Sequence, residues 1–95
     1  MQLGTLLSRF EDETVVFDTL TAMDDGPLMA RVRAAAARDE TDVGVWAYEA
    51  VGRFIISADD EQWLGLMSSC SRAPDPGLAA LRHMLEAQLS EAPPA

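Results

Sequence analysis

The sequence predicts a single all-α domain of four to six short helices, packed as a bundle or an orthogonal array around a central apolar helix at about 42–57. Three observations predict it. Apolar residues recur at helical spacing almost throughout; Ala, a strong helix former, occurs fifteen times in 95 residues; and short acidic or Pro-containing breaks separate the periodic segments. The length fits one domain, which we assign to 1–91, followed by a disordered Pro-rich tail at 92–95.

The first 23 residues carry two apolar stripes. Their spacing is three or four residues, as on one side of a helix. The first stripe is Leu3, Leu6, Leu7 and Phe10, and the second is Val16, Phe17, Leu20 and Met23. Ser8 and Glu11 have the spacing of a capping box, which would start a second segment near residue 9. Whether residues 2–23 form one helix or two is open at this point.

The next helix is predicted from Pro27 to about Arg38. Pro27 suits a first helical position, where its missing N–H needs no partner. The inward residues are expected to be Leu28, Val32, Ala35 and Ala36. Arg31, Arg33 and Arg38 give this segment three positive charges and no negative ones. They could pair with neighbouring acidic helix starts, or form an anion-binding or partner-binding patch.

The segment from about 42 to 57 is the best-defined helix. Its main stripe is Val43, Trp46, Ala47, Ala50, Val51, Phe54 and Ile55, and Val45, Tyr48, Gly52 and Ile56 widen the apolar surface. A helix that is apolar nearly all round is typical of a protein centre. We therefore expect the other helices to pack around it, Trp46 to lie in the core, and Glu49 to pair with Arg53 one turn later.

Two further helices follow. Asp59 and Gln62 have capping-box spacing. The inward side of that helix is expected to carry Trp63, Leu64, Met67 and either Cys70 or Ser71, with Trp63 half exposed. Asp75 and Pro76 indicate the start of the last helix. It carries a narrow seam that resembles a coiled-coil contact. The seam is Leu78, Leu81, Leu85 and Leu89.

The charge balance excludes several classes of partner. Sixteen acidic residues and seven Arg, with no Lys, give a formal net charge of −9. Nucleic acids and anionic membranes bind basic surfaces, so neither is expected as a partner. Most acids fall in clusters at predicted helix starts, where the helix dipole favours negative charge. The charge is therefore expected to serve capping and solubility first, and recognition second.

The remaining composition bears on location and source. No apolar run approaches the ~20 residues of a membrane span, and residues 1–10 lack the features of a signal peptide. A single Cys fits a reducing compartment. We therefore expect a cytoplasmic protein. The abundance of Ala, Arg, Gly and Pro without Lys or Asn is typical of a GC-rich bacterial genome.

The residues that usually carry chemistry are few. His83 is the only His and is expected at the surface, off the seam; Cys70 is expected in the core as a small apolar residue. No pair of Cys or His suggests zinc, and the six Gly residues form no phosphate-binding loop. We therefore assign no catalytic, cofactor-binding or metal-binding residue, and no cofactor.

Three functions are compatible with this reading. The first is a non-catalytic module that docks on another protein or forms a homodimer. The second is an acidic inhibitor or immunity-type protein that blocks a basic surface of its partner. The third is a small-ligand carrier or enzyme accessory subunit, which would need an internal pocket. The candidate partner-binding residues are Arg31, Arg33, Arg38, Trp63, Leu78, Leu81, Leu85 and Leu89.

Overall fold

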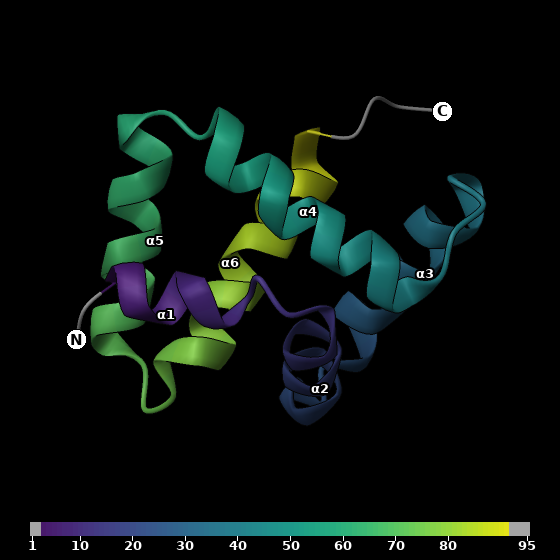
Figure 1. Ribbon diagram of the computed structural model, residues 1–95, viewed down its shortest axis with the longest axis horizontal. Coiled ribbons are helices and arrows are strands. Elements are labelled where there is room, and N and C mark those ends of the chain that lie inside the picture. The colour runs from purple at the N-terminus through teal and green to yellow at the C-terminus, as the bar shows by residue number, and fades with distance from the viewer. Residues whose placement is uncertain (1–2, 92–95) are drawn as a thin grey trace.

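The fold was obtained as a computed structural model, and the structure describes residues 3–91 (Figure 1). Within that range the chain forms six helices and no strand, which confirms the all-α prediction. The helices are α1 (Leu3–Arg9), α2 (Glu13–Met23), α3 (Gly26–Arg38), α4 (Val43–Ser57), α5 (Asp60–Arg72) and α6 (Pro76–Glu91). The predicted tail at 92–95 lies outside the described residues. No helix in the described range is long and apolar enough to cross a bilayer.

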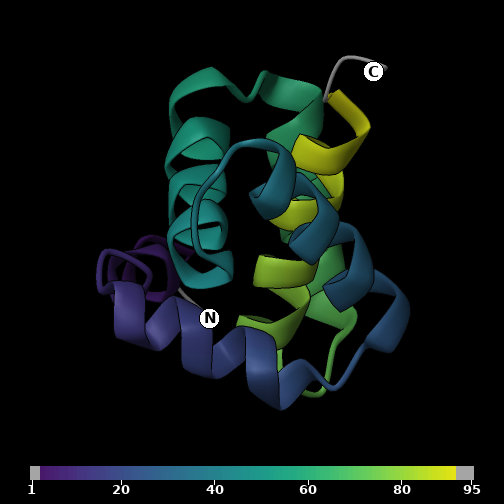
Figure 2. The ribbon, with the colours of Figure 1, turned by 90° about the vertical axis from the view of Figure 1, so that its right-hand side faces the viewer.

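The last helix, rather than α4, occupies the centre. α6 packs against α2, α3, α4 and α5, whereas α4 packs against α2, α3 and α6. Figure 1 shows α4 in front of α6, and Figure 2, turned by 90°, shows α4 along one side of the molecule with α6 beside it. The prediction of a central helix at 42–57 was wrong in this respect. α6 is central because it carries wholly buried apolar residues, small and large, in adjacent positions. These residues are Ala80, Leu81, Met84 and Leu85.

Residues 2–23 contain two helices, because the chain turns after Arg9. The second begins after Asp12, whose side chain accepts from the Thr14 backbone N–H at 2.8 Å. The capping box expected at Ser8 and Glu11 is not used, since the Ser8 hydroxyl donates to the Thr5 carbonyl. The N-cap of α2 is thus the carboxylate of Asp12 rather than the predicted hydroxyl of Ser8.

Three of the other four helix starts carry an acidic side-chain cap. Asp25 accepts from the Leu28 N–H at 3.1 Å, with Pro27 in the first turn. Asp59 and Gln62 form the complete capping box, with bonds of 2.8 and 3.0 Å. Asp75 accepts from two backbone N–H groups of α6. Asp42, before α4, makes no side-chain cap bond. Most acidic clusters therefore do supply helix caps.

The core lies between the six helices and is closed by aromatic contacts. Phe54 is fully buried; its ring meets Trp63 at 5.4 Å and His83 at 6.0 Å, both edge-to-face. Trp46 and Cys70 are buried, as predicted. The Trp46 indole N–H donates to Asp39 at 3.0 Å, so the end of α3 is tied to α4.

Candidate functional site

The outward side of α4 is apolar and, among residues 3–91, only partly covered by the rest of the protein. Five residues form it, and we call them the α4 face: Val45, Tyr48, Gly52, Ile55 and Ile56. The side chain of Ile56 is 87% exposed, that of Ile55 40% and that of Tyr48 37%. Single exposed apolar residues are normal, but several on one side of one helix indicate a contact surface.

The α4 face exists because the helix has more apolar residues than the core uses. Trp46, Ala47, Ala50, Val51 and Phe54 point inward and are buried. The residues expected to widen the buried surface lie on the opposite side, since a helix turns by about 100° per residue. The apolar character that indicated a central helix therefore marks a surface that the chain itself leaves bare.

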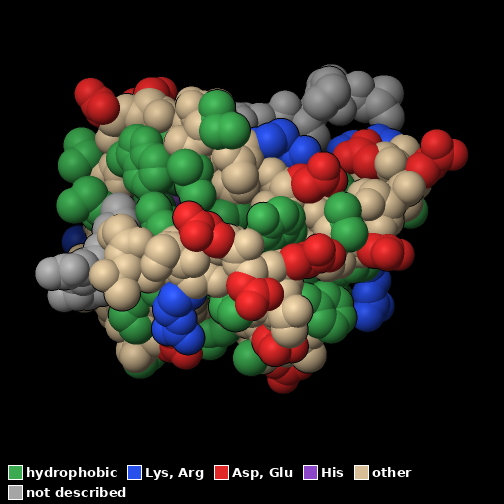
Figure 3. All heavy atoms as spheres, in the orientation of Figure 1, with side chains coloured by type: hydrophobic (Ala, Val, Ile, Leu, Met, Phe, Trp, Pro, Cys, Tyr) green, Lys and Arg blue, Asp and Glu red, His purple; other side chains and the backbone are tan. Residues whose placement is uncertain are grey.

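Hydrophobic exposure continues on the next helix. Leu64 is 64% exposed and Met67 49%. The prediction that both point inward was wrong, because Leu66 and Cys70, one turn apart, face the core and set the phase of α5. In Figure 3, hydrophobic side chains gather over the C-terminal part of α4 and over α5.

Two charged residues border the α4 face. The Arg53 guanidinium lies 5.7 Å from the centre of the Trp46 ring, and its Nε donates to Gln88 Oε1 at 3.2 Å. It makes no ion pair with Glu49, so that prediction was wrong; the ring and the amide hold the guanidinium instead. Among residues 3–91, Glu49 has no ion-pair partner. The border thus carries one acid and one base close together on the same helix.

A groove lies beside the N-terminal end of the α4 face. It has a volume of about 360 Å³ and is lined by Glu13, Thr14, Phe17, Asp42, Gly44 and Val45. Phe17 is 45% exposed. A Cβ on Gly44 would lie 3.2 Å from Phe17 Cδ1, so the absence of a side chain at 44 lets the Phe17 ring lie against α4. The groove floor is therefore apolar.

The candidate arginines lie at the surface of α3. Arg31 pairs with Glu86 of α6 at 2.8 Å, and Arg38 with Asp39 at 3.5 Å. Arg33 is exposed and has no ion pair among the described residues. Two of the three positive charges are thus matched by carboxylates of the same chain. The arrangement favours the pairing interpretation over an anion-binding patch, although Arg31 pairs with α6 rather than with a helix start.

The leucine seam of α6 points into the molecule. Leu81 and Leu85 are fully buried, and Leu78 and Leu89 pack against the same core. Burial therefore removes Leu81 and Leu85 from the candidate partner-binding set, because the central position of α6 surrounds the seam with other helices. Trp63 is partly buried against Phe54.

His83 is partly buried and lies between α5 and α6. Its Nδ1 lies 3.2 Å from the Ser69 hydroxyl, and a Cβ on Gly65 would lie 3.2 Å from its Cε1 and 3.4 Å from its Nε2. The prediction of an exposed surface His was wrong, because Gly65 leaves room for the ring. The Ser69–His83 contact links α5 to α6.

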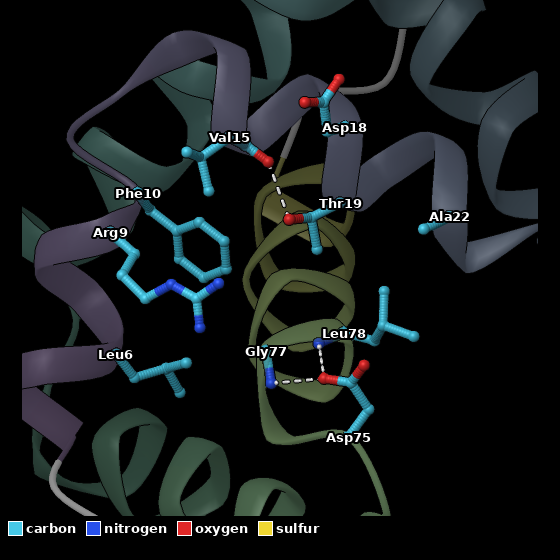
Figure 4. A pocket seen from close by; sticks show the side chains of 10 residues that line it. All are labelled: Leu6, Arg9, Phe10, Val15, Asp18, Thr19, Ala22, Asp75, Gly77 and Leu78. Carbon is cyan, nitrogen blue, oxygen red and sulfur yellow. Dashed lines mark hydrogen bonds between the residues drawn. The ribbon is translucent and has the colours of Figure 1, made fainter.

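A second groove, of about 320 Å³, lies between α1, α2 and the start of α6 (Figure 4). Its polar groups largely serve the helices: Thr19 donates to the Val15 carbonyl and Asp75 caps α6. The Arg9 side chain extends into the groove, and no ion pair holds it among the described residues. A ligand site needs several converging polar groups. Besides Arg9, the groove lining includes the Asp18 carboxylate, so the groove offers one base and one acid and is not assigned a ligand.

No protein-family model, curated protein or solved structure matches this chain. Within residues 3–91, no three His, Cys, Asp or Glu side chains are grouped to hold a metal ion. The α4 face is the feature that the sequence reasoning missed. Its signal was in the sequence: Val45, Tyr48, Gly52 and Ile55 repeat at intervals of three, four and three residues, opposite the stripe that enters the core.

Proposed function

We propose that this protein is a non-catalytic interaction module that binds another protein surface through the α4 face. The single observation that carries this is the exposure of Ile56, Ile55 and Tyr48 on one side of one helix. Apolar surface in water carries a cost of roughly 25 cal/mol per Å². A partner that covers this face would recover that free energy.

The charge distribution supports an apolar contact more than an acidic one. An acidic blocking protein would present a contiguous face of carboxylates to a basic target. On the face that Figure 3 draws, acidic side chains are separated by apolar, basic and uncharged atoms and form no unbroken area. Four of the sixteen acidic residues also cap helices: Asp12, Asp25, Asp59 and Asp75. We therefore place the binding site on the α4 face.

Site-specific photocrosslinking in the living host tests the proposal. A photoreactive amino acid replaces Ile56, in the α4 face, or Ala37, which is exposed on α3. Illumination is expected to give a discrete crosslinked protein species from position 56 and none from position 37. Equal patterns from the two positions, or no crosslinks from position 56, would contradict the proposal.

A further inference from the structure

We infer that the partner of the α4 face is a second copy of the same chain, with the two α4 helices packed antiparallel across a two-fold axis. This inference rests on the proposed function and names the occupant of the site. It is carried by the spacing of the α4 face, by the open space at Gly52 and by the charges at its border.

The spacing of the face is that of a coiled-coil seam. Val45, Tyr48, Gly52 and Ile55 are separated by three, four and three residues, which keeps a straight line of contacts between two helices. In an antiparallel pair centred at residue 50, each Val45 lies opposite Ile55 of the second copy. Each Tyr48 lies opposite Gly52 of the second copy, so every contact occurs twice.

Gly52 provides the space that this register requires. A Cβ built on Gly52 meets no atom within 4 Å, so the surface above it is open. Tyr48 is one helical turn away and 37% exposed. In the proposed pair, the phenol ring of each chain covers the bare backbone of Gly52 on the other. A large side chain opposite Gly allows two helices to approach closely, as knobs enter holes in helix packing.

The charged residues that border the α4 face lie opposite residues of the other sign in the same antiparallel register. In an antiparallel pair related by a two-fold axis, the same edge of each α4 helix faces its copy. Glu49 and Arg53 lie on the same edge of α4, so Glu49 of one chain faces the edge that carries Arg53 of the second. The two positions differ by about 3 Å along the axis at a rise of 1.5 Å per residue, which is within the reach of both side chains. Arg53 has one N–H committed to Gln88, and a guanidinium has five N–H donors. Two ion pairs thus form across the axis.

The exposed apolar side chains extend beyond α4. Leu64, 64% exposed, and Met67, 49% exposed, lie on the adjoining helix α5, so they can add to the apolar centre of an interface that typically buries about 800 Å² per partner. The groove beside Phe17, Gly44 and Val45 lies where the second copy presents Ile55. It adds a concave contact at each end of the seam.

A charge-exchange experiment tests the dimer. Wild type, Glu49→Arg, Arg53→Glu and an equimolar mixture of the two variants are compared by sedimentation velocity at equal total concentration. Glu49→Arg places four positive charges at the interface of its own dimer, and Arg53→Glu four negative ones, so each variant alone is expected to dimerise at least tenfold more weakly than wild type. In the mixture every cross-axis pair is again opposite in sign, and a heterodimer is expected.

A second pair of variants fills the space at Gly52. Gly52→Leu is expected to be folded by circular dichroism but monomeric, because the new side chain occupies the position of the Tyr48 ring. Gly4→Leu adds the same side chain on α1, where a Cβ also meets no atom within 4 Å, and is expected to dimerise like wild type.

The dependence of binding on salt concentration distinguishes self-association from binding of a basic partner. Each chain carries a net charge of −9, so added NaCl screens the repulsion between two copies and is expected to strengthen the dimer. A basic partner would bind more weakly with salt.

Three outcomes would overturn the inference: wild type that remains monomeric at millimolar concentration, a variant mixture that forms no heterodimer, or equal dimerisation of Gly52→Leu and Gly4→Leu. In each case a position-specific crosslink at residue 56 to a different protein would leave the proposed function standing. Absence of that crosslink would remove the proposed function as well.

Discussion

At the residue scale, two small residues decide where larger ones lie. Gly65 makes room for the His83 ring, and Gly44 lets Phe17 lie against α4. Neither effect is visible in the sequence, because each pair joins residues that are far apart along the chain. The burial of Trp46, in contrast, was predicted correctly from the main stripe of its helix, and that of Cys70 from its small apolar side chain.

Cys70 is expected to make stability depend on alkaline pH. Burial raises the pKa of its thiol, so above about pH 8.5 the unfolded chain loses a proton that the folded chain retains. The unfolded state then binds fewer protons, and the free energy of unfolding falls as pH rises. Urea denaturation at pH 7 and pH 10 should show a larger loss for wild type than for Cys70→Ala. Parallel losses in the two proteins would exclude Cys70 as the source.

At the element scale, the positions of helix ends are set by the local sequence, whereas the side of a helix that becomes buried is not. The caps at Asp59 and Asp75 form within a few residues, so sequence alone finds them. Which side of a helix meets the core depends on its neighbours. For that reason Leu64 and Met67 were wrongly predicted to point inward, and α6 rather than α4 proved central.

Two aspartates at helix starts provide a matched test of capping. Asp59→Ala removes one side of a complete capping box and is expected to cost about 1 kcal/mol of the free energy of unfolding. Asp42→Ala alters a cap position without a side-chain hydrogen bond and is expected to cost clearly less. Chemical denaturation of both variants measures the difference. Equal losses would show that the capping bond of Asp59 contributes little.

At the scale of the whole molecule, the fold leaves surplus apolar surface on α4 and surplus negative charge around it. The ion pairs of the described residues are few and exposed, and such pairs contribute little to stability. Burial of the core therefore dominates the stability, while the net charge of −9 opposes compaction through self-repulsion.

Salt is accordingly expected to stabilise the folded monomer. In Gly52→Leu, where the proposed dimer is blocked, raising NaCl from 10 to 150 mM should raise the Tm by a few degrees, because screening weakens repulsion most in the compact state. Thermal unfolding followed by circular dichroism measures this. A Tm that falls with salt would mean that attractive pairs and helix-dipole contacts outweigh the repulsion.

The sequence by itself determined the helices, most of their caps and the class of fold, because periodicity and capping are local. The spacing of the α4 face is also present in the sequence. From the sequence alone, however, an exposed apolar stripe could not be distinguished from a buried one. Only the tertiary structure decided which apolar stripe is covered: α6 takes the centre, and α4 presents its second apolar side to solvent. The physical reason is that burial depends on contacts between distant segments.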